Sequence, residues 1–447
     1  MGHLYQWFHD RAVRQNQIDR PFLVMSDGAY ITFGQFLERV KNNNRADGYR
    51  KLNENFSIVV PVDYSIETLI DIFSLLKEGK SVLVTNPKQY SRNDIYHFAN
   101  GNHNPIDKNI QAGRYDVVYS GSKTNIDSIW MSSSGVTKKP IYWSHNHESL
   151  GWNIDEYCDA FNLDETSFFW PAFPPHSIAF WKSIFVLANC AGRVLFNSYP
   201  IGMDAVNIFN TINNHAITSL AFPPIYAEVL IALHERGVGT FEKSLKRVLC
   251  GGDYLADKTY HEFVHRFRIK PNIIYGSTES AGVITYVNEE DWAPGNIGKM
   301  LKGNYSIEGG GSRGRLILEG GFLSKCLNGK YTTNDIVDIS QGYLRYIGRS
   351  NDIVTFKGQR ISLIEIEEEI LKNENVKAAR VYVELDEKNT LVQIDSRLCL
   401  EVVLVDRNRV VDKNEILSKL NHKIEIDKIL CVDKITRHSS TKIVRTS

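Results

Sequence analysis

The sequence predicts an α/β protein in which a large domain of parallel strands is followed by a smaller α+β domain. Apolar runs typical of buried strands alternate with amphipathic stretches typical of helices over about the first 290 residues. Beyond that point the strands become shorter and glycine turns more frequent. The chain has 447 residues, about two to three times the usual domain length, which fits one large and one small domain.

The first strand–helix–strand unit lies between residues 56 and 86. FSIVVPVD (56–63) is an apolar run that predicts a buried strand, and Ser65 is expected to cap the helix that follows. That helix should end at Gly79, and SVLVTN (81–86) predicts a second strand. The order indicates a parallel pair joined by a right-handed crossover.

The same alternation continues to residue 275 and favours parallel sheets. Helices are predicted at 177–189, 203–214 and 225–235. Strands are predicted at 192–197, 217–222, 246–250 and 271–275.

The C-terminal third has a different pattern. Residues 305–321 predict a hairpin module, so the sheet should become partly antiparallel there. A second hairpin is expected around Lys357 and Gly358, followed by a helix from Leu363 with a capping box of Ser362 and Glu365. Strands are predicted at 381–385 and 400–405. We place a domain boundary near 349–351, which gives domains of residues 1–350 and 351–447.

The composition excludes several classes of protein. Hydrophobic residues make up 43% and charged residues 23%, as in ordinary globular proteins. Lys+Arg and Asp+Glu balance at 52 each, so no overall charge favours nucleic acid or an anionic membrane surface. The six cysteines have no zinc-ligand spacing, and no apolar run approaches the ~20 residues that span a bilayer. We therefore expect a cytoplasmic protein without nucleic-acid or membrane partners.

Three loops at strand ends carry candidate chemistry. MSSSGVTKKP (131–140) follows an apolar strand end at 128–130 and precedes a predicted helix at 147–161. Its hydroxyls and backbone N–H groups suit phosphate oxygens, although the spacing is not that of a Walker loop. CGGDYLADK (250–258) and IIYGSTES (273–280) each follow a strand, where ligands bind in open α/β sheets.

These motifs, in this order, resemble those of the ANL superfamily of adenylate-forming enzymes. SSSGVTKKP resembles the phosphate loop of the family, YGSTE its aromatic-Gly-x-Thr-Glu motif, and TND (333–335) its TGD. GRSND (348–352) with KGQRI (357–361) resembles the hinge and the start of the small domain, and STKIVR (440–445) the loop that delivers a catalytic lysine. The resemblance implies parallel αβαβα sheets, a small β-barrel-like subdomain and a small mobile α+β C-terminal domain.

The resemblance also implies roles for individual residues. Lys442, Thr278 and Glu279 would be catalytic: Lys442 would bridge the acid and the α-phosphate, Thr278 would contact that phosphate, and Glu279 would bind Mg²⁺. ATP would be held by Ser133, Ser134, Thr137, Gly252, Tyr275, Asp335, Arg349 and Arg360. His176 and Gly276 would contact the acid, and Asn351 would be the hinge.

The chain departs from the family motifs at several positions. Lys138 replaces a glycine of the phosphate loop, Val136 a threonine and Ile141 a lysine; a lysine at a glycine position disfavours a positive φ. Asn334 replaces the glycine of TGD, and Thr441 replaces the glycine before Lys442. These changes leave open a degenerate, noncatalytic nucleotide-binding member of the family.

The expected substrate is an aryl or acyl acid without an α-amine. Enzymes of this family that activate α-amino acids pair the ammonium group with an aspartate, but Pro175, His176 and Ser177 stand at that place. Aromatic residues at 169–181 could surround the acid or form core. No carrier segment follows Lys442, so the thiol of CoA or of a freestanding carrier protein is expected in trans. A luciferase-like or β-lactone-forming fate of the adenylate is a further alternative.

Overall fold

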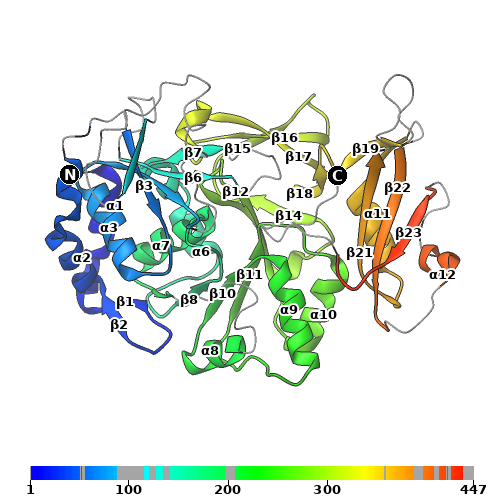
Figure 1. Cartoon of the computed structure of the whole chain (residues 1–447), viewed down its shortest axis with the longest axis horizontal. Helices are drawn as coiled ribbons and strands as arrows, with labels where there is room; N and C mark the ends of the chain where they lie inside the picture. The colour runs from blue at the N-terminus through cyan, green and yellow to red at the C-terminus, as the bar shows by residue number, and fades with distance from the viewer. Residues whose placement is uncertain are drawn as a thin grey trace.

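The computed structural model describes most of the chain (Figure 1). The described residues are 2–50, 52, 56–87, 115–119, 127–133, 141–196, 207–356, 359–385, 396–406, 412–418, 420 and 424–435. Its α-helices are α1 (His3–Ala12), α2 (Phe33–Asn42), α3 (Ile66–Lys77), α5 (His147–Gly151), α6 (Ile154–Ala160), α7 (Ile178–Cys190), α8 (Ile208–Asn214), α9 (Pro224–Glu235), α10 (Asp257–Phe267), α11 (Leu363–Leu371) and α12 (Lys413–Leu417).

The strands alternate with these helices up to β12 and then follow one another. They are β1 (Pro21–Val24), β2 (Tyr30–Thr32), β3 (Phe56–Pro61), β4 (Ser81–Thr85), β5 (Asp116–Tyr119), β6 (Ile129–Ser132), β7 (Tyr142–His145), β8 (Phe168–Pro171), β9 (Arg193–Leu195), β10 (Ser219–Phe222), β11 (Arg247–Gly251), β12 (Asn272–Ser277), β13 (Gly282–Val287), β14 (Asn296–Met300), β15 (Asn304–Ile307), β16 (Arg313–Glu319), β17 (Lys330–Ser340), β18 (Tyr343–Arg349), β19 (Ile353–Phe356), β20 (Gln359–Ser362), β21 (Val376–Leu385), β22 (Ser396–Leu404) and β23 (Lys428–Cys431).

Two sheets confirm the predicted α/β class. A 13-stranded sheet has the order β15-β16-β17-β18-β14-β13-β12-β11-β10-β8-β9-β1-β2, and a 5-stranded sheet has the order β5-β3-β4-β6-β7. Strands β1, β9, β8, β10, β11 and β12 pair in parallel, as do β3, β4 and β6. From β13 onward the large sheet continues antiparallel, as the glycine-rich pattern predicted.

The largest core cluster lies between the two sheets and around α7 (Figure 1). α7 has ten buried residues out of thirteen because it packs against β8, β9 and β13 of the large sheet and against α1 and α6. Rings of α1, α2 and α3 form an aromatic cluster beside it, in which Phe8 and Phe73 lie 4.5 Å apart between centroids. Burial of such rings stabilises a core by several kcal/mol each.

The helix predicted after β3 exists, but its start differs in detail. Ser65 occupies the N-cap position of α3 without a side-chain capping bond, so the predicted cap is wrong. Beside the helix start, the Asp63 carboxylate accepts hydrogen bonds from the Ser65 N–H (3.0 Å) and the Thr68 hydroxyl (2.9 Å) instead. A carboxylate is the stronger acceptor of the two. Gly79 follows the helix end with a φ of +71°, as expected of a helix stop.

The helix predicted at 147–161 is two helices, α5 and α6, separated by Trp152 and Asn153. The Asn153 amide group explains the break, because it donates to the Val283 carbonyl (2.8 Å) and accepts from the Lys182 ammonium (2.5 Å). β7, which lies between the phosphate loop and α5, was not predicted. Its residues, two aromatic followed by Ser144 and His145, pair antiparallel with β6.

The C-terminal segment, residues 353–435, has its own core. Its predicted hairpin (β19–β20) and helix α11 are confirmed, and α11 packs against the sheet of β21, β22 and β23. Residues 357 and 358, at the hairpin tip, lie outside the described residues. Only the N–H half of the predicted capping box is present: the Ser362 hydroxyl accepts from the Glu365 N–H (3.3 Å) and donates to the Ile347 carbonyl (2.9 Å).

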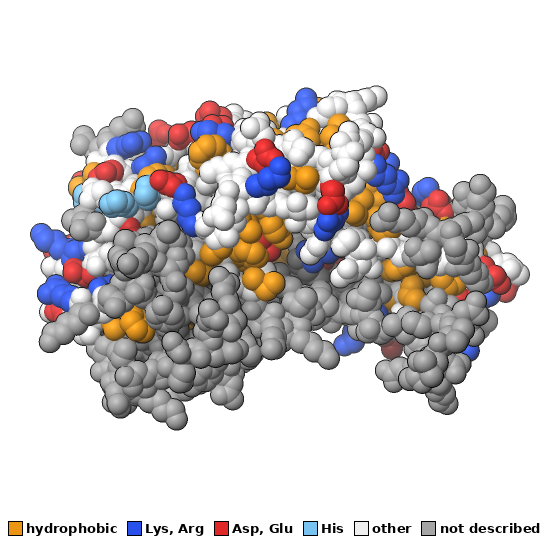
Figure 2. Space-filling model, turned by 90° about the horizontal axis from the view of Figure 1, so that it is seen from above, with side chains coloured by type: hydrophobic (Ala, Val, Ile, Leu, Met, Phe, Trp, Pro, Cys, Tyr) orange, Lys and Arg blue, Asp and Glu red, His pale blue; other side chains and the backbone are white. Residues whose placement is uncertain are grey.

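The surface matches the balanced composition. Figure 2 shows Lys/Arg and Asp/Glu side chains spread over the described part of one face, with hydrophobic side chains gathered near its middle. In the described part of the chain no helix is long and apolar enough to cross a bilayer.

The aromatic cluster generates a stability prediction. Phe73 is fully buried against the rings of Phe8, Phe36 and Phe185, so Phe73→Ala should lower the free energy of unfolding by about 3–5 kcal/mol in urea titrations. Tyr30→Ala is the control, since Tyr30 is 55% exposed and should change it by about 0.5 kcal/mol or less. Equal losses in both variants would contradict this account of the core.

Candidate active site

The candidate site is built at the carboxyl end of β12, where Tyr275 and Gly276 lie. β12 pairs antiparallel with β13, and the register is irregular between these two residues. A Cβ atom on Gly276 would lie 1.9 Å from the Gly282 carbonyl oxygen, so any other residue would push the two strands apart. The predicted functional glycine is therefore required by strand packing.

A hydrogen-bonded network joins Tyr275 to the antiparallel part of the sheet. The Tyr275 hydroxyl donates to Asp335 Oδ2 (2.7 Å), and Arg349 Nε lies 3.4 Å from Asp335 Oδ1. Asp335 on β17 and Arg349 on β18 are opposite each other in the register of the two strands. Burial, with a further contribution from the Asp335 charge, raises the pKa of Tyr275 well above its usual value. Its hydroxyl therefore stays a donor.

Tyr331 links Glu279 to the same network. Its hydroxyl hydrogen-bonds the Glu279 carboxylate, and its ring lies 6.1 Å from that of Trp143 on β7 in an edge contact. Burial, followed by the charges of Glu279 and Asp335, raises the pKa of Tyr331, which keeps the hydroxyl protonated. The Glu279 side chain is thus held toward the network by a donor that the sequence motifs did not indicate.

β7 supports the backbone of the Thr278–Glu279 turn. His145, which is fully buried, has its Nε2 2.6 Å from the Thr278 carbonyl oxygen and must donate there. Ser324 joins the two segments as well: its N–H donates to the Glu279 carbonyl (2.8 Å) and its hydroxyl to the Ser144 carbonyl (2.9 Å). Burial lowers the pKa of His145 to about 4, so the imidazole is neutral at physiological pH.

The candidate phosphate loop begins beside this support. Ser133 follows β6, and its N–H donates to the Ile141 carbonyl (2.8 Å), which pairs the two ends of the loop. Ile141 is 52% exposed. Ser134, Val136, Thr137 and Lys138 lie outside the described residues.

The region expected to hold the acid begins at α7. His176 is half-buried just before the helix, and burial lowers its pKa to about 4. Gly252, with a φ of +90°, brings the loop after β11 to Phe173, since a Cβ on Gly252 would lie 3.9 Å from that ring. Three of the aromatic side chains weighed as pocket residues, Phe169, Phe180 and Trp181, are 0–1% exposed in the hydrophobic core.

Lys182 is a buried cation that the sequence motifs missed. It is 2% exposed and its ammonium donates to the Leu150 carbonyl (2.8 Å) and to Asn153 Oδ1 (2.5 Å). Burial lowers its pKa to about 7. The side chain passes Gly282, whose Cβ would lie 3.3 Å from Lys182 Cβ. In the sequence, the position of this lysine inside the apolar run IAFWKSIF (178–185) could have indicated a buried cation.

The remaining predicted residues are not joined to the network by a described contact. Asn351 is exposed in the turn between β18 and β19, where a hinge was expected. The Arg360 backbone lies on β20 opposite Thr355. Thr441 and Lys442 lie outside the described residues.

Glu279 is compatible with the expected magnesium ion. Mg²⁺ is commonly held by one or two carboxylates together with substrate phosphates and water. Across the residues that the structure describes there is no group of three or more His, Cys, Asp or Glu side chains that could hold a metal. A single carboxylate at position 279 suits an ion that arrives with a triphosphate.

Comparison with known proteins agrees with this geometry. Residues 128–308, which include β6, β7 and β12, match the family described as AMP-binding enzyme. The fold matches the ATP-bound MatB of Rhodopseudomonas palustris over 98% of this chain and 97% of that one, with a TM-score of 0.79 and 17% identity. A second solved structure, O-succinylbenzoate Coenzyme A synthetase (MenE) of Bacillus subtilis with ATP and magnesium, matches over 98% of both chains at a TM-score of 0.76 and 16% identity. The chain therefore has the fold of these two structures, and the match to the AMP-binding enzyme family covers its residues 128–308.

The curated relatives differ from this chain mainly in length. Bacitracin synthase 2 of Bacillus licheniformis is 22% identical over 80% of this chain, which spans only 15% of that protein's length. The L-proline--[L-prolyl-carrier protein] ligase of Pseudomonas fluorescens is 24% identical over 70% of this chain and 66% of its own length. These comparisons leave the acid and the acceptor of this chain open.

The buried histidine generates a pH prediction. A base whose pKa is lowered from 6.5 to about 4 resists protonation in the folded state, so it destabilises the fold as the pH falls from about 6.5 toward 4. His145→Gln should reduce the difference between the free energies of unfolding at pH 7.5 and pH 5, measured in urea. His176 also lowers stability as the pH falls, and it does so equally in the unaltered protein and in His145→Gln. His261→Gln, at a residue whose side chain is 63% exposed, is the control; an unchanged pH dependence in His145→Gln would contradict the prediction.

Proposed function

We propose that the chain activates a carboxylic acid with ATP and passes the acyl group to a thiol. A carboxylate oxygen of the acid attacks the α-phosphorus of ATP, and pyrophosphate leaves as the acyl-adenylate forms. The thiol sulfur then attacks the acyl carbon, and AMP leaves. The observation that carries the proposal is the Tyr275–Asp335–Arg349 network beside the Thr278–Glu279 turn.

The side chains of the network would act by positioning and by charge. Asp335 has acceptor oxygens that suit ribose hydroxyls, and Tyr275 presents a ring suited to a base. Thr278 is held by its carbonyl at His145, which leaves its hydroxyl for the α-phosphate. A magnesium ion bound at Glu279 would neutralise phosphate charge. Phosphoryl transfer requires little covalent help from the protein, so such positioning accounts for most of the catalysis.

The remaining roles extend this proposal to other predicted residues. Ser133, Ser134 and Thr137 would hold the β- and γ-phosphates. Lys442 would bridge the acid and the α-phosphate, which lowers the repulsion between two anions that must meet. Residues 351–447 would form a separate small domain that turns at Asn351 and brings Lys442 in and out.

For the acid, we infer an aryl or acyl carboxylate without an α-amine. An ammonium group taken out of water requires a carboxylate partner, and residues 175–177 supply none. His176 is neutral above about pH 4 and suits an uncharged part of the acid. The acceptor would be CoA or a carrier protein supplied in trans.

Asp335→Asn tests the nucleotide site. The substitution keeps the shape of the side chain but weakens its hydrogen bonds from Tyr275 and Arg349, so kcat/KM for ATP in acid-dependent pyrophosphate exchange should fall about 10- to 100-fold. Asp338→Asn, three residues further along β17, is the matched control and should leave the rate within about twofold. Equal effects of the two substitutions would argue against a nucleotide at Asp335.

Lys442→Ala tests the acid step. Loss of the ammonium should nearly abolish pyrophosphate exchange while ATP binding, measured by calorimetry, changes little. Unchanged exchange would remove Lys442 from the mechanism.

A panel of aryl, acyl and amino acids, assayed by pyrophosphate release and followed by CoA or carrier proteins, identifies the substrate.

The replacement of a loop glycine by Lys138 favours one alternative, a noncatalytic nucleotide-binding protein. That alternative predicts ATP binding without pyrophosphate release for every acid. Product mass spectrometry without added thiol would detect a luciferase-like or lactone-forming reaction.

A further inference from the structure

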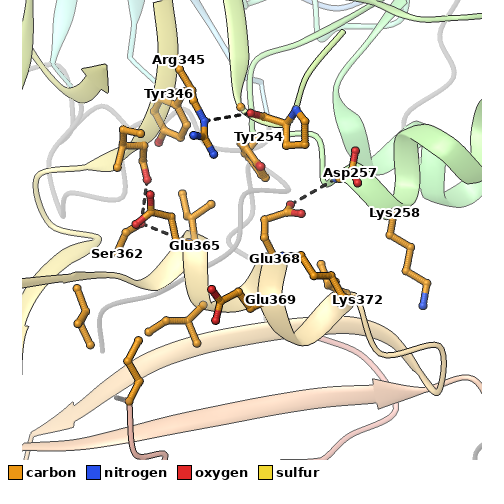
Figure 3. Close-up of a pocket in the computed structure, with 18 of the residues that line it drawn as sticks. Tyr254, Asp257, Lys258, Arg345, Tyr346, Ser362, Glu365, Glu368, Glu369 and Lys372 are labelled. Carbon is orange, nitrogen blue, oxygen red and sulfur yellow. Dashed lines mark hydrogen bonds between the residues drawn. The ribbon is translucent and has the colours of Figure 1, made fainter. Parts of the chain in front are cut away.

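A cavity of 770 Å³ separates the C-terminal segment from the large sheet (Figure 3). One wall comes from the start of α10, from residues 294–295 just before β14, and from β18, and the other comes mainly from α11. The two sides belong to different hydrophobic clusters, since the core of α11 and β21–β23 shares no residue with the other three. The contacts that bridge this cavity therefore determine how the segment is oriented.

Glu368 makes the first bridge. It projects from α11 toward the N-terminal end of α10 (Figure 3), where the Asp257 N–H donates to its Oε1 at 3.4 Å. The Tyr254 hydroxyl also hydrogen-bonds the Glu368 carboxylate. The free N–H groups at a helix N-terminus favour a carboxylate at this place.

Lys258 makes the second bridge. Its ammonium donates to the Val376 carbonyl at the start of β21 and to the Asn373 carbonyl at 3.4 Å. Two further contacts between the two parts, Arg313 with Glu365 (4.0 Å) and Lys377 with Glu235 (3.9 Å), join exposed side chains and contribute little. Next to the chain connection, the Ser362 hydroxyl also donates to the Ile347 carbonyl (2.9 Å). Tyr254, Lys258 and Glu368 are thus the partly buried polar side chains that join the α10 side of the cavity to α11 and β21 in the described part of the chain.

We propose that Tyr254, Lys258 and Glu368 are positioning residues that hold α11 and β21 against α10, and that their release controls how readily the C-terminal segment changes its orientation. Parts of a chain joined through small polar interfaces move relative to one another by default. A cavity on one side of the contact means that few apolar atoms must separate when the bridges open. The effect on catalysis rests on the proposed function, because only there does the orientation of this segment matter.

The contact should respond to pH through Glu368. Burial, together with the charges of Asp257 on α10 and Glu367 on α11, raises the pKa of Glu368 to about 7, against the hydrogen bonds from Tyr254 and Asp257. The docked arrangement therefore binds a proton more tightly than the released one, and docking weakens as the pH rises from about 4.5 to about 7. Other charged residues that line the cavity are Lys258, Arg345, Glu365, Glu369, Lys372 and Glu374.

Hydrogen–deuterium exchange tests the contact without any substrate. Lys258→Met keeps the length of the side chain but removes its donors, so amides in peptides of 254–262 and 363–380 should exchange at least about threefold faster. Lys330→Met, which removes a surface ion pair with Glu319, should leave these peptides unchanged. Tyr254→Phe repeats the test with loss of one hydroxyl only. Unchanged exchange in both Lys258→Met and Tyr254→Phe would overturn the proposal.

Two further measurements separate positioning from general stability. Glu368→Gln mimics the protonated carboxyl, so protection of the two faces, corrected for intrinsic exchange, should no longer fall between pH 5 and pH 7 as it does in the unaltered protein. In the proposed reaction, Lys258→Met should change the ratio of the pyrophosphate-exchange rate to the thiol-transfer rate at least about threefold. An unchanged pH response, or equal losses in both half-reactions, would contradict the positioning role. Failure to find any acid substrate would leave the exchange test intact.

Discussion

The hydrogen bond from Tyr275 to Asp335 joins the parallel part of the large sheet to its antiparallel extension. Tyr275 ends the run of parallel strands, and Asp335 lies on β17, four places away in the strand order. Gly276 permits the close approach of β13 that aims the tyrosine at β17. Because Asp335 is opposite Arg349, the last residue of β18, the same network reaches the point where the chain enters its C-terminal segment. The proposed nucleotide site and the entry into the C-terminal segment thus share one set of polar contacts.

Sequence patterns predicted the parallel framework well because its strands are buried on both faces. β3, β4, β10, β11 and β12 are short apolar runs between helices, and such runs have few alternative structures. The network residues Tyr275, Asp335 and Arg349 were found from ordered motifs, and the structure brings those three together. Local periodicity did not reveal β7, because its four residues, YWSH, are too few and show no alternation of apolar and polar side chains.

The supporting residues could not be predicted because their partners are distant in the sequence. His145 contacts a carbonyl 133 residues away, and Ser324 contacts Ser144 across 180 residues. The burial of Lys182 is explained by the Leu150 carbonyl and Asn153 Oδ1, which accept hydrogen bonds from its ammonium. Ser65 shows a different limit: it stands at the N-cap position, but the carboxylate two residues before it, Asp63, makes the side-chain hydrogen bonds at the helix start. Sequence patterns thus predict the first residue of a helix more reliably than the side-chain atoms that make hydrogen bonds there.

The pairing of β6 with β7 has an evolutionary consequence for the loop between them. The ladder runs to Ser132 opposite Tyr142 and is extended by the bond between Ser133 and Ile141, so both ends of the connecting stretch are anchored by main-chain atoms. Main-chain anchoring is indifferent to side-chain identity. Substitutions between residues 133 and 141, such as Lys138, can therefore accumulate without displacing His145 or the turn that it supports. Sequence drift at this place and conservation of the surrounding architecture are compatible.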